Sequence, residues 1–221
     1  MLKINSMCPD FQAKTTEGDI SFHEWLGDSW GVIFSHPKDF TPVCTTELGA
    51  LGLMKDEFDK RNVKVIGLSV DGVEDHKKWL DDIKDVSGTK PNYPIIADED
   101  LKVAKLFNML EADAGTTSMG RTAVDNETVR TIFVIRPDKR IGLYLTYPMA
   151  TGRNFMELLR SIDSMQLTAK HKVATPAESY PLYSSFFKEF KIIPVTGLLL
   201  LIPTMPHIII TFFSLNFFDL L

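Results

Sequence analysis

Short apolar runs alternate with longer amphipathic segments along the first two thirds of the chain. Runs rich in β-branched and aromatic residues predict strands at residues 30–35, 63–70, 93–97, 130–135 and 141–146. Segments rich in helix formers predict helices at residues 45–60, 73–84, 101–107 and 154–166. Strands separated by helices imply parallel crossovers, and residues 137–140 predict a hairpin turn between the last two strands. The expected fold is α/β, with a central mixed sheet flanked by helices.

Cys44 stands just after the first of these strands, where a helix begins. Thr41 occupies a helix N-cap position, and Pro42 takes the first helical position, where its missing N–H costs nothing. Cys44 then lies in the first turn, where unpaired backbone N–H groups and the helix dipole favour a thiolate over a thiol. The other interpretation is a buried structural cysteine, which the spacing alone does not exclude.

Three segments carry a family resemblance. The segment SHPKDFTPVCTTEL, at residues 35–48, contains the pattern Pro-x-x-x-Thr-x-x-Cys and resembles the active-site segment of the peroxiredoxins. Its flanks, together with YPMATGRN at 147–154 and VATP at 173–176, resemble the 1-Cys branch, of the peroxiredoxin 6 type. The similarity runs from about Ile4 to Ala177 and implies a thioredoxin-like domain over residues 1–166. It also implies a thiol-dependent peroxidase that needs no bound cofactor.

The resemblance implies a role for each matching residue. Cys44 would attack the O–O bond of hydrogen peroxide or of an organic or phospholipid hydroperoxide and become a sulfenic acid. Thr41 would hydrogen-bond the bound peroxide, and Pro37 would shield the sulfur from bulk water. Arg130 would place a permanent positive charge beside the sulfur. From the residues alone, Arg130 could equally be an exposed charge at the end of a strand, and Thr41 only a cap.

Arg153 and His36 complete the implied site. Arg153 would support the groups that touch the sulfur, and His36 would line the pocket wall. Read without the family, Arg153 merely precedes a helix. A noncatalytic redox sensor, in which Cys44 oxidises without turning over, is an alternative to the peroxidase.

The second cysteine, Cys8, leaves the source of reductant open. It would either resolve the sulfenic acid as a disulfide or be an incidental buried thiol. If Cys8 does not resolve, the reductant is an external thiol; the resemblance implies glutathione, delivered by a glutathione transferase. The resemblance also implies a homodimer, and the predicted strand at 141–146 is a candidate edge for pairing two sheets. The five histidines show no paired-ligand spacing, so no metal site is predicted.

A second activity is suggested by residues 27–31, which fit the hydrolase pattern G-x-S-x-G around Ser29. The 1-Cys branch is associated with a phospholipase A2 activity, and residues matching its proposed triad, His23, Ser29 and Asp138, are present. However, Ser29 precedes a predicted strand instead of following one, which is the wrong context for a nucleophile elbow. A short helix that starts with a capping box at Ser21 accounts for the same residues.

The C-terminal region, residues 167–221, departs from the family pattern. Residues 192–218 form a run of 27 without a single Lys, Arg, Asp or Glu, which is long enough to span a bilayer as a helix. Pro194, Pro203 and Pro206 argue against one uninterrupted helix. This hydrophobic tail is therefore a membrane anchor, a segment buried against the domain or a partner, or an aberrant C-terminus.

Composition limits the domain size, the binding partners and the location that can be expected. The chain has 221 residues, of which 44% are apolar, so it can bury one substantial core. A net charge of -5 without a concentrated basic run argues against nucleic-acid binding. The first six residues lack the apolar core of a signal peptide, and a reducing cytoplasmic setting is therefore expected.

Overall fold

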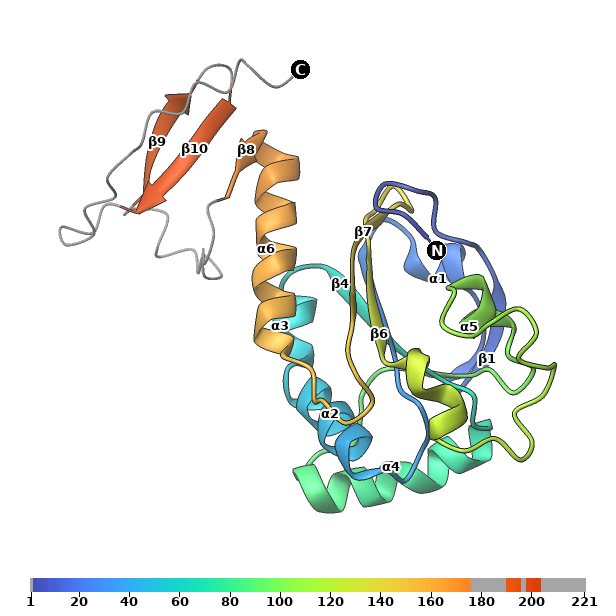
Figure 1. The fold of residues 1–221 in the computed structure, drawn as a ribbon. Helices are drawn as coiled ribbons and strands as arrows, with labels where there is room; N and C mark the ends of the chain where they lie inside the picture. Colours follow the sequence, from blue (N-terminus) through green and yellow to red (C-terminus); the bar gives the residue numbers. More distant parts are fainter. Residues whose placement is uncertain (1, 176–189, 196–197, 204–221) are drawn as a thin grey trace. The chain divides into compact units, whose positions relative to one another are not determined.

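An unbroken apolar run at residues 30–35 forms strand β3 (Trp30–Ser35), whose six residues are all buried, near the centre of a seven-stranded sheet (Figure 1). The sheet order is β2-β1-β5-β4-β3-β6-β7. The other six strands are β1 (Gln12–Thr15), β2 (Gly18–Ser21), β4 (Val63–Ser69), β5 (Ile95–Ala97), β6 (Thr131–Ile135) and β7 (Ile141–Thr146). Strands β3, β4 and β5 run parallel, and the remaining pairs are antiparallel. The predicted mixed α/β sheet is confirmed, with the 141–146 strand at its edge.

Helices cover both faces of this sheet (Figure 1). They are α1 (Phe22–Leu26), α2 (Pro42–Leu53), α3 (Lys55–Asp59), α4 (Val73–Ser87) and α5 (Lys102–Leu106), with a 3-10 segment η1 (Val124–Val129) before β6. Ile33 packs in a core with residues of α1 and α5. Its neighbour Phe34 contacts the ring of Tyr93, whose hydroxyl donates to the Leu48 carbonyl of α2. Because side chains alternate along a strand, α2 lies on the opposite face from α1 and α5.

Some elements of the fold differ from the prediction. The helix expected at 45–60 breaks at Met54 into α2 and α3. The expected capping box at Ser21 is wrong, because the Ser21 side chain makes no cap and Asp10 accepts a hydrogen bond from the His23 backbone N–H instead. The hairpin of β1 and β2 was not predicted, because its strands are short and largely exposed.

The structure is a computed structural model that describes residues 2–175, 190–195 and 198–203. It divides within helix α6 (Phe155–His171) into two units, Met1–Leu159 and Arg160–Leu221, whereas the sequence suggested a boundary after residue 166. The second unit contains a small sheet, in the order β8-β10-β9. Its strands are β8 (Val173–Ala174), β9 (Phe190–Val195) and β10 (Leu198–Pro203).

The described part of the hydrophobic tail therefore consists of two antiparallel strands, β9 and β10. Pro194 pairs with Leu199, and Pro203 pairs with Phe190. Within the described residues, no helix combines the length and the apolar character needed to cross a bilayer. Residues 196–197 and 204–218 of the predicted tail lie outside the described residues.

Glycine 49 lets α2 approach α4 closely. A Cβ at Gly49 would lie 2.3 Å from the Ser87 Cβ, whereas at Gly52, also in α2, the nearest atom would be 3.4 Å away. We expect Gly49→Ala to destabilise the protein by about 1–3 kcal/mol through overpacking. Gly52→Ala is the control and should be neutral or stabilising by up to about 1 kcal/mol, because alanine favours a helix over glycine. Urea unfolding measures both, and equal midpoints for the two variants would contradict the close approach.

Candidate active site

The sulfur of Cys44 lies in the first turn of α2 and is fully buried. Thr41 is the N-cap residue with extended backbone angles, and Pro42 takes the first helical position, as predicted. The cap differs in one respect: the Thr41 hydroxyl donates to the Lys38 carbonyl oxygen at 3.0 Å and makes no cap bond of its own. Cys44 is thus placed where the helix N-terminus favours an anion.

Arg130 is the cation that contacts this sulfur among the residues with described contacts. It ends η1 just before β6, is buried, and donates from Nη2 to the Cys44 Sγ at 3.3 Å. Its Nη1 donates to Oε2 of Glu47 at 2.5 Å. The interpretation of Arg130 as an exposed strand-end charge is therefore wrong, and its guanidinium is in place to stabilise a thiolate.

Glu47, which sequence reasoning missed, joins two arginines. It lies one helical turn after Cys44 and is buried. Arg153 donates to Oε1 of Glu47 from its backbone N and from Nε, at 2.8 and 3.0 Å, and to Oε2 from Nη2 at 2.7 Å. Arg153 also donates from Nη1 to the Ser35 carbonyl oxygen at 2.7 Å. The signal in the sequence was a carboxylate three residues after the cysteine, on the same face of a helix that has no other charged residue.

Pro37 and His36 lie in the loop between β3 and α2, and both are buried. The Pro37 carbonyl accepts a hydrogen bond from the Asn126 amide of η1 at 3.0 Å. The His36 Nε2 contacts Oδ1 of Asp39 at 2.7 Å. Oδ2 of the same carboxylate contacts Nδ1 of His76, in α4, at 2.6 Å. Asn126 and His76 were also missed, because only the fold brings them to this loop. Asp39 belongs to the loop and was missed because its contact with His76 exists only in the folded chain.

The three groups His36, Asp39 and His76 form the one cluster with metal-ligand chemistry found among the described residues. Their nitrogen-to-oxygen distances of 2.6 and 2.7 Å are those of charge-assisted hydrogen bonds. Both oxygens of the carboxylate are already occupied by ring nitrogens. Protons therefore join these groups, and the geometry does not fit a metal ion between them.

Burial and pairing act in opposite directions on the three pKa values. Burial lowers the pKa of His36. Burial alone would raise the pKa of Asp39, but hydrogen bonds from both histidines outweigh it and lower that pKa to about 2. Burial likewise opposes the charge on His76, but the hydrogen bond and charge of Asp39 outweigh it and raise the pKa of His76. An ionised Asp39 thus pairs with one charged and one neutral imidazole.

Comparison with known proteins identifies the family. The AhpC/TSA family matches residues 4–143. The 1-Cys peroxiredoxin of Dictyostelium discoideum is 51% identical over 177 residues, which cover 80% of this chain and 70% of that protein. Peroxiredoxin-6 of Gallus gallus is 50% identical over 182 residues, covering 80% of this chain and 79% of that protein. A solved yeast mitochondrial 1-Cys peroxiredoxin superposes with a TM-score of 0.79 at 50% identity, covering 88% of this chain and 87% of the other.

This chain belongs to the 1-Cys peroxiredoxins of the AhpC/TSA family. The predicted thioredoxin-like fold and the thiol-dependent peroxidase activity are thereby confirmed.

Cys8 of this peroxiredoxin lies on the other face of the sheet. It packs in the core with Ile33, Phe22 and Leu26, whereas Cys44 belongs to α2 on the opposite side. Burial, with a smaller effect of the Asp10 charge, raises the pKa of the Cys8 thiol to about 12. The sheet separates the two sulfurs, and at neutral pH Cys8 remains a thiol rather than the thiolate that disulfide exchange requires.

The residues of the predicted hydrolase triad have other partners. The Ser29 hydroxyl donates to the Asn62 side chain at 2.9 Å. His23 Nε2 contacts the Cys8 carbonyl oxygen at 3.0 Å. Asp138 forms an ion pair with Arg136 at 3.2 Å and lies 3.9 Å from the Arg140 guanidinium. No described contact joins the three, so the acyl hydrolase stays a prediction without structural support.

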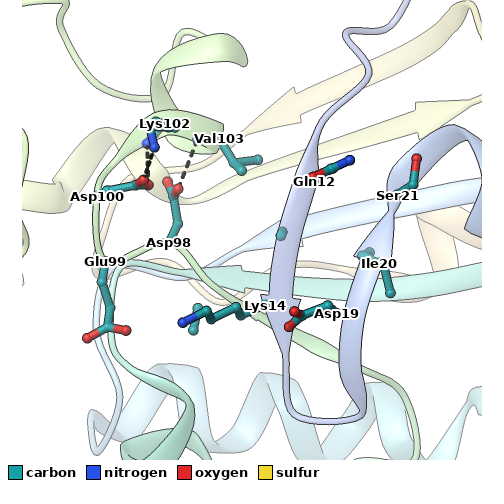
Figure 2. A pocket seen from close by; sticks show the side chains of 12 residues that line it. Gln12, Lys14, Asp19, Ile20, Ser21, Asp98, Glu99, Asp100, Lys102 and Val103 are labelled. Atoms are coloured by element: carbon teal, nitrogen blue, oxygen red, sulfur yellow. Dashed lines mark hydrogen bonds and ion pairs between the residues drawn. The ribbon is translucent and has the colours of Figure 1, made fainter.

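A pocket of about 630 Å³ lies elsewhere, between the β1–β2 hairpin, the end of β5 and the start of α5 (Figure 2). Lys14 and Asp19 line it from the hairpin side, and Asp98, Glu99 and Asp100 line it from the other. The Asp98 carboxylate accepts hydrogen bonds from the backbone N–H groups of Val103 and Ala104. Asp100 forms an ion pair with Lys102. None of the pocket residues belongs to the Cys44 site.

The Arg130 contact predicts the reactivity of Cys44. Since a hydrogen bond to a charged group contributes about 1.5–3 kcal/mol, alkylation of Cys44 by iodoacetamide near neutral pH should slow about 10- to 100-fold in Arg130→Gln. Arg136→Gln, which removes a partly exposed guanidinium paired with Asp138, is the control and should alkylate like the wild type. Equal rates in the two variants would show that Arg130 does not stabilise the thiolate.

The position of Cys8 predicts that it does not resolve Cys44. Cys8→Ala should keep thiol-dependent turnover, because no described contact of Cys8 reaches the Cys44 side of the sheet. Oxidised wild-type protein should show no loss of about 2 mass units, the signature of a disulfide between Cys8 and Cys44. Intact-mass analysis after stoichiometric peroxide tests this, and a Cys8–Cys44 disulfide would refute it.

Proposed function

We propose that Cys44 is the nucleophile of the peroxidase and that hydrogen peroxide and organic hydroperoxides, including those of phospholipids, are its substrates. The thiolate attacks the terminal peroxide oxygen, a sulfur–oxygen bond forms and the O–O bond breaks. Cys44 becomes a sulfenic acid, and the leaving alkoxide or hydroxide takes a proton to become an alcohol or water. The observation that carries this proposal is the Arg130 Nη2 contact, 3.3 Å from a sulfur buried at a helix N-terminus.

The neighbouring residues have complementary roles in this proposal. Arg130 stabilises the thiolate and then the negative charge that develops on the peroxide oxygens. The Thr41 hydroxyl already donates its proton to Lys38, so its oxygen is available to accept the O–H of a bound peroxide. Pro37, buried and held by Asn126, keeps bulk water from the sulfur. Glu47 and Arg153 hold Arg130 in place.

We also propose an external thiol as the reductant, with glutathione as the first candidate and a glutathione transferase as a possible carrier. The separation of Cys8 from Cys44 supports this, and thiol resolution in the yeast mitochondrial relative runs through glutathione and thioredoxin systems. A homodimer through the edge strand β7 and a cytoplasmic location remain proposals. The edge position of β7 supports the first, and two free buried thiols suit the reducing compartment of the second.

The proposal predicts where peroxide oxidises the protein. After stoichiometric peroxide, the peptide containing Cys44 should gain about 16 or 32 mass units, the sulfenic and sulfinic steps, while Cys8 stays unmodified. With excess glutathione the protein should consume peroxide through many cycles, and Cys44→Ser should abolish consumption. An unmodified Cys44, or full consumption by Cys44→Ser, would refute the assignment. Oxidation of Cys44 without turnover in any thiol would instead support the redox-sensor alternative.

A further inference from the structure

A buried carboxylate joins three separate elements next to Cys44. Asp39 lies in the loop before α2, His36 directly follows β3, and His76 lies in the first turn of α4. The Asp39 carboxylate is almost fully buried, and both imidazoles are fully buried. The peroxidase mechanism proposed above uses neither Asp39 nor His76.

The hydrogen-bond partners fix the protons on the two rings. His76 faces an acceptor with each nitrogen, the Asp39 carboxylate at Nδ1 and the Ile96 carbonyl oxygen at Nε2, 3.2 Å away. Both nitrogens must then carry protons, and His76 is an imidazolium. His36 faces Asp39 with Nε2, and its buried Nδ1 has no hydrogen-bond partner among the described residues. His36 is therefore neutral, with its proton on Nε2.

Helix α4 also contacts the loop before Cys44 through a second residue, Trp79. Trp79, three residues after His76, packs its ring 5.1 Å from that of His36. Its indole N–H donates to the Thr45 hydroxyl, which in turn donates to the Thr41 carbonyl oxygen at 2.9 Å. Helix α4 thus contacts the active-site segment both before and after Cys44.

We propose that His76 is a positioning residue of the peroxidase. Through the Asp39 carboxylate, its imidazolium holds His36 neutral in the Nε2-protonated tautomer and anchors the loop that carries Pro37 and Thr41. The proposal rests on the role proposed for Cys44, because it concerns the placement of that site. The proposed role of His76 is not a catalytic one, because His76 acts on the site only through Asp39.

Removing the charge of His76 should move a proton to His36. The charged groups that face the cluster are Asp39 itself and Asp71. Asp71 is already neutralised in part by Lys38, at 2.6 Å, and also accepts the Asp39 backbone N–H. Without His76, the buried Asp39 carboxylate has His36 as its remaining titratable partner. Repulsion from His76, which lowers the pKa of His36, would also disappear.

The test compares His76→Leu, His76→Asn and Ile83→Ala. Asparagine can still donate to Asp39 but carries no charge, whereas leucine does neither. Ile83→Ala, a buried truncation in the same helix, is the control for general destabilisation. The readouts are the nitrogen NMR shifts of the His36 ring across pH and the rate of Cys44 oxidation by peroxide across pH.

In both His76 variants we expect His36 to become an imidazolium near neutral pH, and the rate profile to gain an ionisation that the wild type lacks. The oxidation rate should fall on the order of 10²-fold in His76→Leu, which is the effect of displacing reacting groups by about 1 Å. The fall should be smaller in His76→Asn. Ile83→Ala should lower stability with an unchanged His36 tautomer. A His36 that stays neutral in both His76 variants, or that changes equally in Ile83→Ala, would overturn the proposal. The NMR readout needs no activity, so it separates this outcome from a failure of the Cys44 assignment.

Discussion

The Glu47 carboxylate, held between the Arg130 and Arg153 guanidinium groups, is the interaction on which the site depends. All three side chains are buried, so their charges are not screened by solvent. One carboxylate and two guanidinium groups leave one net positive charge next to the sulfur, and a Cys44 thiolate would bring the sum to zero. Breaking such a buried pair by removing one partner costs about 3–5 kcal/mol, because the other charge is left uncompensated. The contacts that the fold needs for its own stability are thus the same ones that place a net positive charge beside the Cys44 sulfur.

These contacts also explain why the site needs the whole sheet. Arg130 enters at the start of β6, Glu47 comes from α2, and Arg153 reaches the Ser35 carbonyl at the end of β3. Arg153 additionally stacks its guanidinium 5.4 Å from the centre of the Phe34 ring. The strand order places β3 between β4 and β6, which brings residues 86 positions apart in sequence into hydrogen-bond contact. A local peptide around Cys44 would contain only one of the three charges.

The sequence was sufficient for the elements that local patterns determine. The buried strand at 30–35, the N-cap at Thr41 and the edge strand at 141–146 were all predicted, because apolar runs, proline and turn residues act within a few positions. The family resemblance added Arg130 and Arg153, which no local pattern distinguishes from surface charges. Glu47, Asp39 and His76 were missed, because a charged residue in a helix or loop is usually solvated and only tertiary packing shows that it is buried. The capping box at Ser21 failed for the same reason, since Asp10 arrives from a distant segment.

The loop before Cys44 combines local backbone strain with several hydrogen bonds to other elements. Phe40 adopts a φ of +57°, which costs a non-glycine residue about 1–2 kcal/mol. On either side, Asp39 is bound by two histidines and by Asp71, and the Thr41 carbonyl by Thr45. Because the Cys44 sulfur has no exposed surface, an external thiol reaches it only when this loop or the first turn of α2 moves. The contacts that hold this loop therefore oppose the movement that the thiol reductant of our proposal would need.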